Sequence, residues 1–141
     1  MNNKAPQSYR DLQIWKMARA LAIAVHKMTI EQLPKYEMYE VGSQIRRSSK
    51  SVSSNIVEGF GRKRYRNEYI KFLTYALSSC DETREHLEML HATGSLKNQS
   101  LFETLQQQYD ILGRKINKFR QRVIANDHNV PEAGLDQSAT N

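Results

Sequence analysis

The feature that most restricts the fold is a helical periodicity with few residues able to interrupt it. Near the carboxyl end, apolar residues recur at alternating steps of three and four, namely Leu101, Leu105, Tyr109, Leu112, Ile116, Phe119 and Val123. This stripe is typical of an amphipathic helix that packs against other helices along one side. The chain has only three prolines and six glycines, which favours long uninterrupted helices over many turns.

The same periodicity appears in three earlier segments. We expect four helices, at about 10–30, 36–59, 67–92 and 98–125. Helices of this length joined by short links pack most economically as an antiparallel, up-down-up-down bundle. The predicted fold class is therefore all-α, with a bundle domain at 9–125, a flexible segment at 1–8 and a disordered acidic tail at 126–141.

Residues that favour helix termini mark the expected ends. Asn67 is the predicted N-cap of the third helix, and Ser100 with Glu103 fits a capping box for the fourth. Stop signals follow each of the first three helices, namely Pro34, then Gly59 and Gly61, then Thr93 and Gly94.

Charge and composition narrow the classes of function. The net charge is +6 and the pI is about 9.5, although residues 126–141 carry three acids and no base. A basic body of this kind favours polyanionic partners. The one cysteine excludes an intrachain disulfide and any site with several cysteines. The longest apolar run, ALAIAV, is too short to cross a membrane and the first residues lack a leader, so we expect a cytoplasmic protein with no membrane contact.

The run QIRRSSKSVSSNIVEGFGRK, residues 44–63, has an unusual inner face. At about 100° per residue, Ser48, Ser49 and Ser53 fall with the apolar positions, whereas Arg46, Arg47 and Lys50 fall opposite. Small side chains allow a neighbouring helix to come close, and buried hydroxyls can bond to a carbonyl one turn earlier. A catalytic role is disfavoured, because no histidine stands at a recognisable spacing and no GxSxG motif occurs.

Metal and thiol chemistry are also disfavoured. Glu88 and His91 form a lone Glu-x-x-His, whereas a di-iron bundle needs a second copy and two more inward glutamates. We therefore expect no metal, no cofactor and no enzymatic activity, with His91 contacting the last carbonyls of its helix. Cys80 lies in the apolar stripe of the third helix, which predicts a buried, unreactive thiol.

Arg84 falls in the apolar sector of the third helix, where a charge needs a partner. In an antiparallel hairpin that turns near residue 64, position 84 lies opposite about position 44. Glu40 and Gln44 are therefore candidate partners, and a contact across a subunit interface would serve equally well.

Basic residues form the candidate nucleic-acid-binding set. They lie on the second helix, in the loop after it and on the outer side of the fourth helix, and comprise Arg46, Arg47, Lys50, Arg62, Lys63, Arg64, Arg66, Arg114, Lys115, Lys118 and Arg122. Tyr65 lies among the loop residues, where it could stack on an exposed base while the cations contact phosphates. A solvated basic loop and solvated helix faces are the alternative interpretation.

Three segments resemble the 23S rRNA-intervening sequence proteins, also called four-helix-bundle or S23 proteins. They are DLQIWKMARALAIAVHKMT, LPKYEMYEVGSQIRRSSKSVSSNIVEGFGRK and NEYIKFLTYALSSCDETREHLEML. With the fourth helix they span about residues 9–120. The combination of QIRR, SNIxEG and GFGRK is specific. Ser53 departs from the family pattern, which often has proline there, so the second helix is expected to be straighter.

The resemblance implies a four-helix bundle that assembles into a homopentamer and has no known enzymatic activity. Family genes lie in sequences inserted within bacterial 23S rRNA genes, and a structurally similar group assists reverse transcriptases. The predicted function is therefore non-enzymatic binding of RNA or DNA, within an oligomer, through basic faces. The alternative is a protein-interaction scaffold or an accessory subunit of an enzyme such as a reverse transcriptase.

Overall fold

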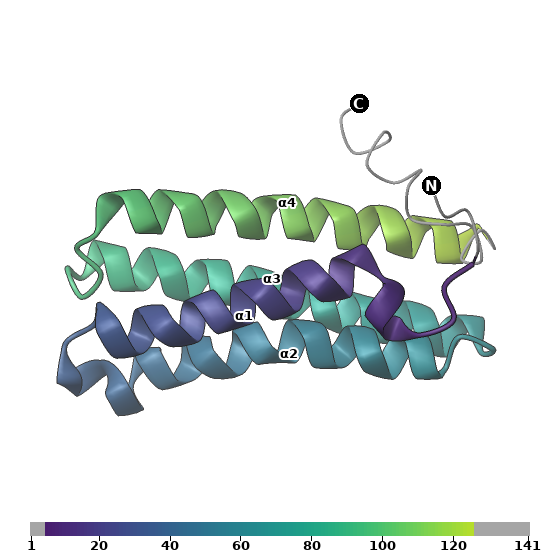
Figure 1. Cartoon of the computed structure of the whole chain (residues 1–141), viewed down its shortest axis with the longest axis horizontal. Helices are drawn as coiled ribbons and strands as arrows, with labels where there is room; N and C mark the ends of the chain where they lie inside the picture. Colours follow the sequence, from purple (N-terminus) through teal and green to yellow (C-terminus); the bar gives the residue numbers. More distant parts are fainter. Residues whose placement is uncertain (1–4, 126–141) are drawn as a thin grey trace.

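Four long helices follow one another in antiparallel order along the chain (Figure 1). The computed structural model describes residues 5–125, and this part of the chain contains no strand. The helices are α1 (Gln13–Glu31), α2 (Val41–Gly61), α3 (Arg66–Ala92) and α4 (Gln99–Ile124). Short 3-10 turns, η1 (Tyr9–Asp11) and η2 (Lys35–Tyr39), precede α1 and α2. The predicted all-α four-helix bundle is confirmed.

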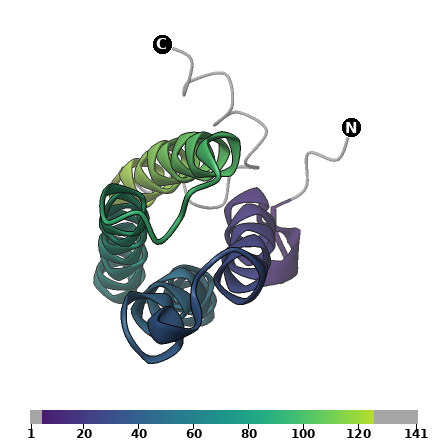
Figure 2. The same cartoon turned by 90° about the vertical axis from the view of Figure 1, so that its left-hand side faces the viewer.

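The helices occupy successive corners of the bundle when it is seen from one end (Figure 2). Neighbours along the chain pack side by side, α2 with α3 most extensively, and α4 closes the ring against α1 with fewer contacts. The core between them is apolar, and its largest fully buried side chains include Tyr69, Tyr109, Leu12, Ile45 and Leu73. The stripes predicted from the sequence face this core.

The second predicted helix is divided at its start. η2 holds residues 35–39 and α2 begins only at Val41, because the backbone folds tightly over Gly42. A Cβ at Gly42 would lie 2.4 Å from the carbonyl oxygen of Glu37. The buried Glu37 carboxylate then accepts hydrogen bonds from the Val41 amide (3.2 Å) and from Ser95 Oγ (2.6 Å). These bonds tie η2 to the loop between α3 and α4.

Of the two predicted stop glycines, Gly61 is the last residue of α2, whereas Gly59 does not end the helix. The helix continues without interruption from Val41 through Gly61. Gly59 instead lies against α3, where an added Cβ would be 3.2 Å from Phe72 Cβ and from Tyr69 Cδ1. It is a contact glycine that lets the two backbones approach.

Two predicted caps were also wrong. Tyr65, rather than Asn67, precedes α3 and makes no side-chain cap. Asn98 caps α4 by accepting from the Leu101 amide (3.0 Å), so Ser100 lies inside the helix and forms no capping box. Each predicted cap lies two residues after the observed one, because helix starts depend on how the preceding loop packs.

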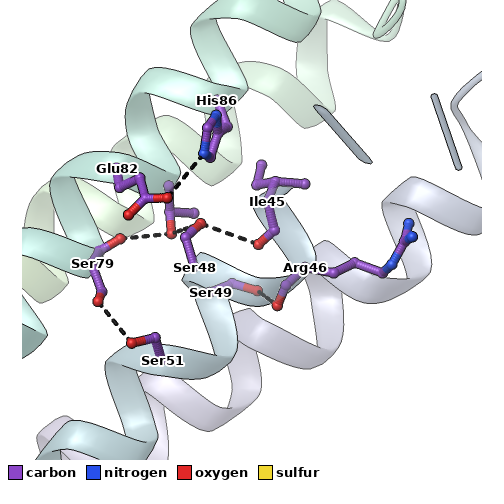
Figure 3. A network of polar contacts seen from close by, with 9 residues as sticks. Ile45, Arg46, Ser48, Ser49, Ser51, Ser79, Glu82 and His86 are labelled. Carbon is purple, nitrogen blue, oxygen red and sulfur yellow. Dashed lines mark hydrogen bonds and ion pairs between the residues drawn. The ribbon is translucent and has the colours of Figure 1, made fainter. Parts of the chain in front are cut away.

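Hydroxyl groups line the contact between α2 and α3 (Figure 3). Ser48 Oγ lies 2.8 Å from Thr83 Oγ1, and Thr83 in turn donates to the carbonyl oxygen of Ser79 (2.8 Å). Ser79 Oγ donates to Ser51 Oγ (2.9 Å). Ser49 is buried and donates to the carbonyl oxygen of Arg46 (3.1 Å). Because each of these hydroxyls finds a hydrogen-bond partner, the internal bonds offset the cost of removing the hydroxyls from water. The packing role predicted for Ser48 and Ser49 is confirmed.

Arg84 pairs with neither Glu40 nor Gln44, contrary to the prediction. Its guanidinium lies 3.6 Å from the Asp110 carboxylate on α4. The prediction placed position 84 in a hairpin of α2 and α3 alone, whereas α3 also packs against α4.

His91 likewise contacts α4 rather than the end of its own helix. Its ring stacks on Phe102, with centroids 4.0 Å apart, and Nε2 lies 2.7 Å from Gln99 Oε1. Of the predicted terminal segments, residues 1–4 and the whole tail at 126–141 lie outside the described residues. Within residues 5–8, Ser8 caps η1.

Candidate nucleic-acid interface

The outer side of the α1–α2 pair carries positive charge without intervening acids. No Asp or Glu occurs between Leu12 and Ile30, or between Val41 and Val57. The exposed cations of these two runs are Lys16, Arg19, Lys27, Arg47 and Lys50. Within residues 5–125 none of the five forms an ion pair with a carboxylate. The surface is therefore able to attract a polyanion along two adjacent helices.

A groove of about 420 Å³ lies on this surface between α1 and α2. Ala22 and Ile23 supply apolar lining, and Ser53 borders it from α2. Three cations stand around it, Arg19 and Lys27 from α1 and Lys50 from α2, together with His26. Its volume falls within the range of small-ligand sites, roughly 300–1,000 Å³.

Arg46 and Arg47 are neighbours in sequence with different environments. Arg46 is half-buried, and its guanidinium donates to the carbonyl oxygen of Met38 (2.6 Å) and to Thr29 Oγ1 (3.0 Å). It therefore joins α2 to η2 and α1. Arg47 is exposed on the outer side of α2. Of the three cations predicted on α2, Arg47 and Lys50 are open to solvent, and Arg46 serves the fold.

The loop after α2 forms a second basic region at the opposite end from η2. Arg62 lies between the carboxylates of Glu58 (3.6 Å) and Glu68 (3.4 Å), and over the ring of Phe72 (5.0 Å). Lys63 lies over Phe60 at 4.4 Å. The acids and the rings already engage these two cations, so the field they offer to a phosphate is reduced.

Arg64 and Tyr65 complete this loop. Both are exposed, and Tyr65 retains 67% of its surface. An accessible tyrosine beside an accessible arginine fits the predicted combination of stacking and phosphate contact. Tyr36, Tyr39 and Tyr75 are exposed as well.

Arg66 has a structural contact in addition to its charge. Its guanidinium donates to the carbonyl oxygens of Val123 (3.2 Å) and Ile124, the last residues of α4. A cation at this position also interacts favourably with the negative end of the helix dipole. Arg66 therefore fastens the end of α4 to the start of α3.

The predicted residues on α4 share one side of that helix but differ in environment. Arg114 is exposed and pairs with Asp110 one turn earlier. Lys115, Lys118 and Arg122 are half-buried. The eleven predicted residues thus do not form one surface. They divide among the α1–α2 face, the loop after α2, and α4.

Sequence reasoning missed the cations of α1. Lys16, Arg19 and Lys27 recur with Ile23 at three- and four-residue steps, on the side of α1 opposite the core. That spacing was available in the sequence, as was the absence of acids from the same run. What it could not show is that this side of α1 lies next to Lys50 of α2.

The cysteine considered for thiol chemistry is a packing residue in the core. Cys80 is fully buried, and burial together with the Asp81 carboxylate raises the pKa of its thiol to about 12. In the described part of the chain no group of three or more His, Cys, Asp or Glu side chains is positioned to hold a metal. None of the described helices is long and apolar enough to span a bilayer.

Comparisons with known proteins place the chain among relatives. A family model described as 23S rRNA-intervening sequence protein matches residues 10–118. The fold is similar to a crystal structure from Bacteroides thetaiotaomicron, described as a protein of unknown function from the S23 ribosomal protein family. The TM-score is 0.69 at 20% identity, covering 76% of this chain and 97% of that one. No curated protein matches the sequence.

Proposed function

This chain belongs to the 23S rRNA-intervening sequence protein family, and from that membership we propose that it binds nucleic acid, RNA in particular, without catalysing a reaction. The observation that carries the proposal is the α1–α2 face. Two adjacent helices there present five exposed cations and, between Leu12 and Ile30 and between Val41 and Val57, no acid. Phosphate contacts supply most of non-specific affinity for nucleic acids, and they require such cations.

The loop after α2 extends the proposed surface. Arg64 and Tyr65 are exposed beside the engaged pair Arg62 and Lys63. Single-stranded or looped RNA leaves bases free to stack on an aromatic ring, whereas a duplex does not. The proposal therefore favours structured RNA with unpaired bases over duplex DNA.

The binding unit is proposed to be an oligomer, and a homopentamer by resemblance to the family. Five copies would bring a formal charge of 5 × 6 = +30, taking +6 for each chain. An apolar and aromatic cluster at the η2 end supports self-association. Ile30, Tyr36, Met38 and Tyr39 are exposed there, and Tyr39 retains 90% of its surface. Aromatic residues are enriched in protein interfaces.

The test is fluorescence anisotropy with a structured RNA and a duplex DNA of equal length, across a salt series, with the oligomer mass measured on the same sample. Affinity should fall steeply as salt rises, with a slope that reports the number of phosphates neutralised. The RNA should bind more tightly. An oligomer that binds neither probe at low salt would remove the nucleic-acid proposal.

The exposed cluster at the η2 end favours one second candidate, a scaffold for a partner protein. Ile30, Tyr36, Met38 and Tyr39 would then contact that protein instead of another copy of the chain. A pull-down after nuclease treatment distinguishes the two candidates. A single stoichiometric protein that remains bound, and is lost on Tyr39→Ser, would support the scaffold.

A further inference from the structure

The groove between α1 and α2 combines an exposed apolar lining with charged side chains of a single sign. Its apolar lining is open to solvent, with Ile23 exposed by 42%. The charged side chains around it, Arg19, Lys27 and Lys50, are all cationic. Complementary chemistry would be a short segment with apolar side chains to cover Ile23 and carboxylates to meet the cations.

The chain itself contains such a segment beyond Ala125. Residues 126–141 carry the acids Asp127, Glu132 and Asp136 and no Lys or Arg. Val130 and Leu135 stand among these acids. The chain therefore carries both the negative charges and the apolar side chains that would complement the groove.

The length of the segment matches the path to the groove. α4 ends at the end of the bundle where α1 begins, and the two helices are neighbours (Figures 1 and 2). Ile23 lies ten residues after Gln13, the first residue of α1, and at 1.5 Å per residue this is about 15 Å. Crossing α1 adds about 10–12 Å. An extended chain covers about 3.3 Å per residue, so the sixteen residues after Ala125 can span about 53 Å. That leaves about half of their length for the step from α4 to α1 and for contacts in the groove.

We propose that the α1–α2 groove is the docking surface for the acidic segment 126–141 of the same chain. Leu135 covers Ile23, and Glu132 and Asp136 lie toward Lys50 and Arg19. This docking does not require that the protein bind nucleic acid. Where both hold, the segment covers cations that a phosphate backbone would otherwise contact.

Cysteine crosslinking in the full chain tests the docking directly. Ser53→Cys places a thiol beside the groove, and Gly134→Cys places one in the acidic segment without removing Leu135. The native Cys80 can stay, because it is fully buried and its thiol is protonated at neutral pH. The rate of intramolecular disulfide formation in a glutathione buffer is measured on denaturing gels.

The matched control pairs Gly134→Cys with Ser78→Cys. Ser78 is exposed on α3 and lies twelve residues after Arg66, which is at the same end of the bundle. The segment can reach both positions, so tethering alone predicts similar rates. Docking raises the local concentration of residue 134 at the groove, and the Ser53 pair should form its disulfide at least about tenfold faster.

A further variant separates docking from general attraction between acids and bases. Ile23→Ser keeps every charge and alters an exposed side chain, so the fold should persist. It should slow the Ser53 crosslink about threefold or more if the apolar contact exists. Equal rates for the two cysteine pairs, no response to Ile23→Ser, or a product that joins two chains would each overturn the proposal.

Discussion

Helix α2 contacts its two neighbours in different ways. Toward α3 it presents Gly59 and buried serines, and hydroxyls bond across the contact, as between Ser48 and Thr83. Toward α1 it leaves a groove whose edge carries Lys50 and Arg19. The first contact fills its space with small side chains and satisfies its polar atoms internally. The second leaves cationic side chains and apolar surface open to solvent. One helix therefore serves stability on one side and carries the surface proposed for binding on the other.

The largest expected effect tests the closeness of the α2–α3 contact. Gly59→Leu forces a side chain against Phe72 and Tyr69, where a Cβ alone would already lie 3.2 Å from their atoms. Overpacking of this kind costs about 3 kcal/mol of unfolding free energy, measured by urea denaturation followed by circular dichroism. Gly61→Leu is the matched control, since nothing lies within 4 Å of its Cβ position. An equal loss in both variants would contradict the close contact.

The next effect separates the adjacent arginines of α2. Arg46→Gln removes hydrogen bonds to the Met38 carbonyl oxygen and Thr29 Oγ1 and should cost about 2 kcal/mol of unfolding free energy. Arg47→Gln changes an exposed side chain and should alter stability by less than about 0.5 kcal/mol. In nucleic-acid binding the order reverses, because only Arg47 is open to a phosphate. Similar stability in the two variants would show that Arg46 has no structural role.

Removing charge around the groove should weaken nucleic-acid binding without unfolding the bundle. The triple variant Arg19→Gln, Lys27→Gln and Lys50→Gln should lower RNA affinity about tenfold. The slope of log affinity against log salt should decrease in magnitude by about 2, because each contact with a single-strand phosphate contributes about 0.7. The matched control removes three cations elsewhere, by Lys71→Gln, Arg84→Gln and Arg114→Gln. These already have acidic neighbours, so binding should change little. Equal losses would indicate a response to net charge alone.

The smallest effect concerns the hydroxyl pair of the α2–α3 contact. Ser48→Ala and Thr83→Val each remove one partner of a 2.8 Å contact in the core. A double-mutant cycle should give a coupling energy of about 1 kcal/mol. Ser54→Ala, an exposed serine on the same helix, should be neutral. A coupling energy near zero would mean that the serines are retained for their small size alone.

Helical period predicted most of the fold but not the ends of its elements. The core stripe of α4, from Leu105 to Val123, faces inward as expected. The start of α2 was misplaced, because a buried Glu37 and the tight approach over Gly42 hold residues 35–39 as a separate turn. Those contacts depend partly on Ser95, 58 residues away, and no local pattern contains that information.

The candidate interface was predicted only in part. Arg47 and Lys50 were assigned to the outer side of α2 from the 100° rule, and the structure places them there. The same rule placed Arg46 with them, although Arg46 is hydrogen-bonded to Met38 and Thr29. The rule gives the direction in which a side chain leaves its own helix, but not the residues that it contacts. The α1 cations were overlooked, since a face on one helix becomes part of an interface only when its neighbour is known.

The sequence by itself determined four helices, their inward faces and a long basic run free of acids, because these properties repeat at the period of a single helix. Tertiary structure alone decided that Arg84 pairs with Asp110, that Gly59 is a point of contact and that Arg19 stands across a groove from Lys50. Each of these involves two helices. Whether two such residues meet depends on which sides of the two helices pack together and on the offset between the helices. The apolar period along a single helix does not contain this information.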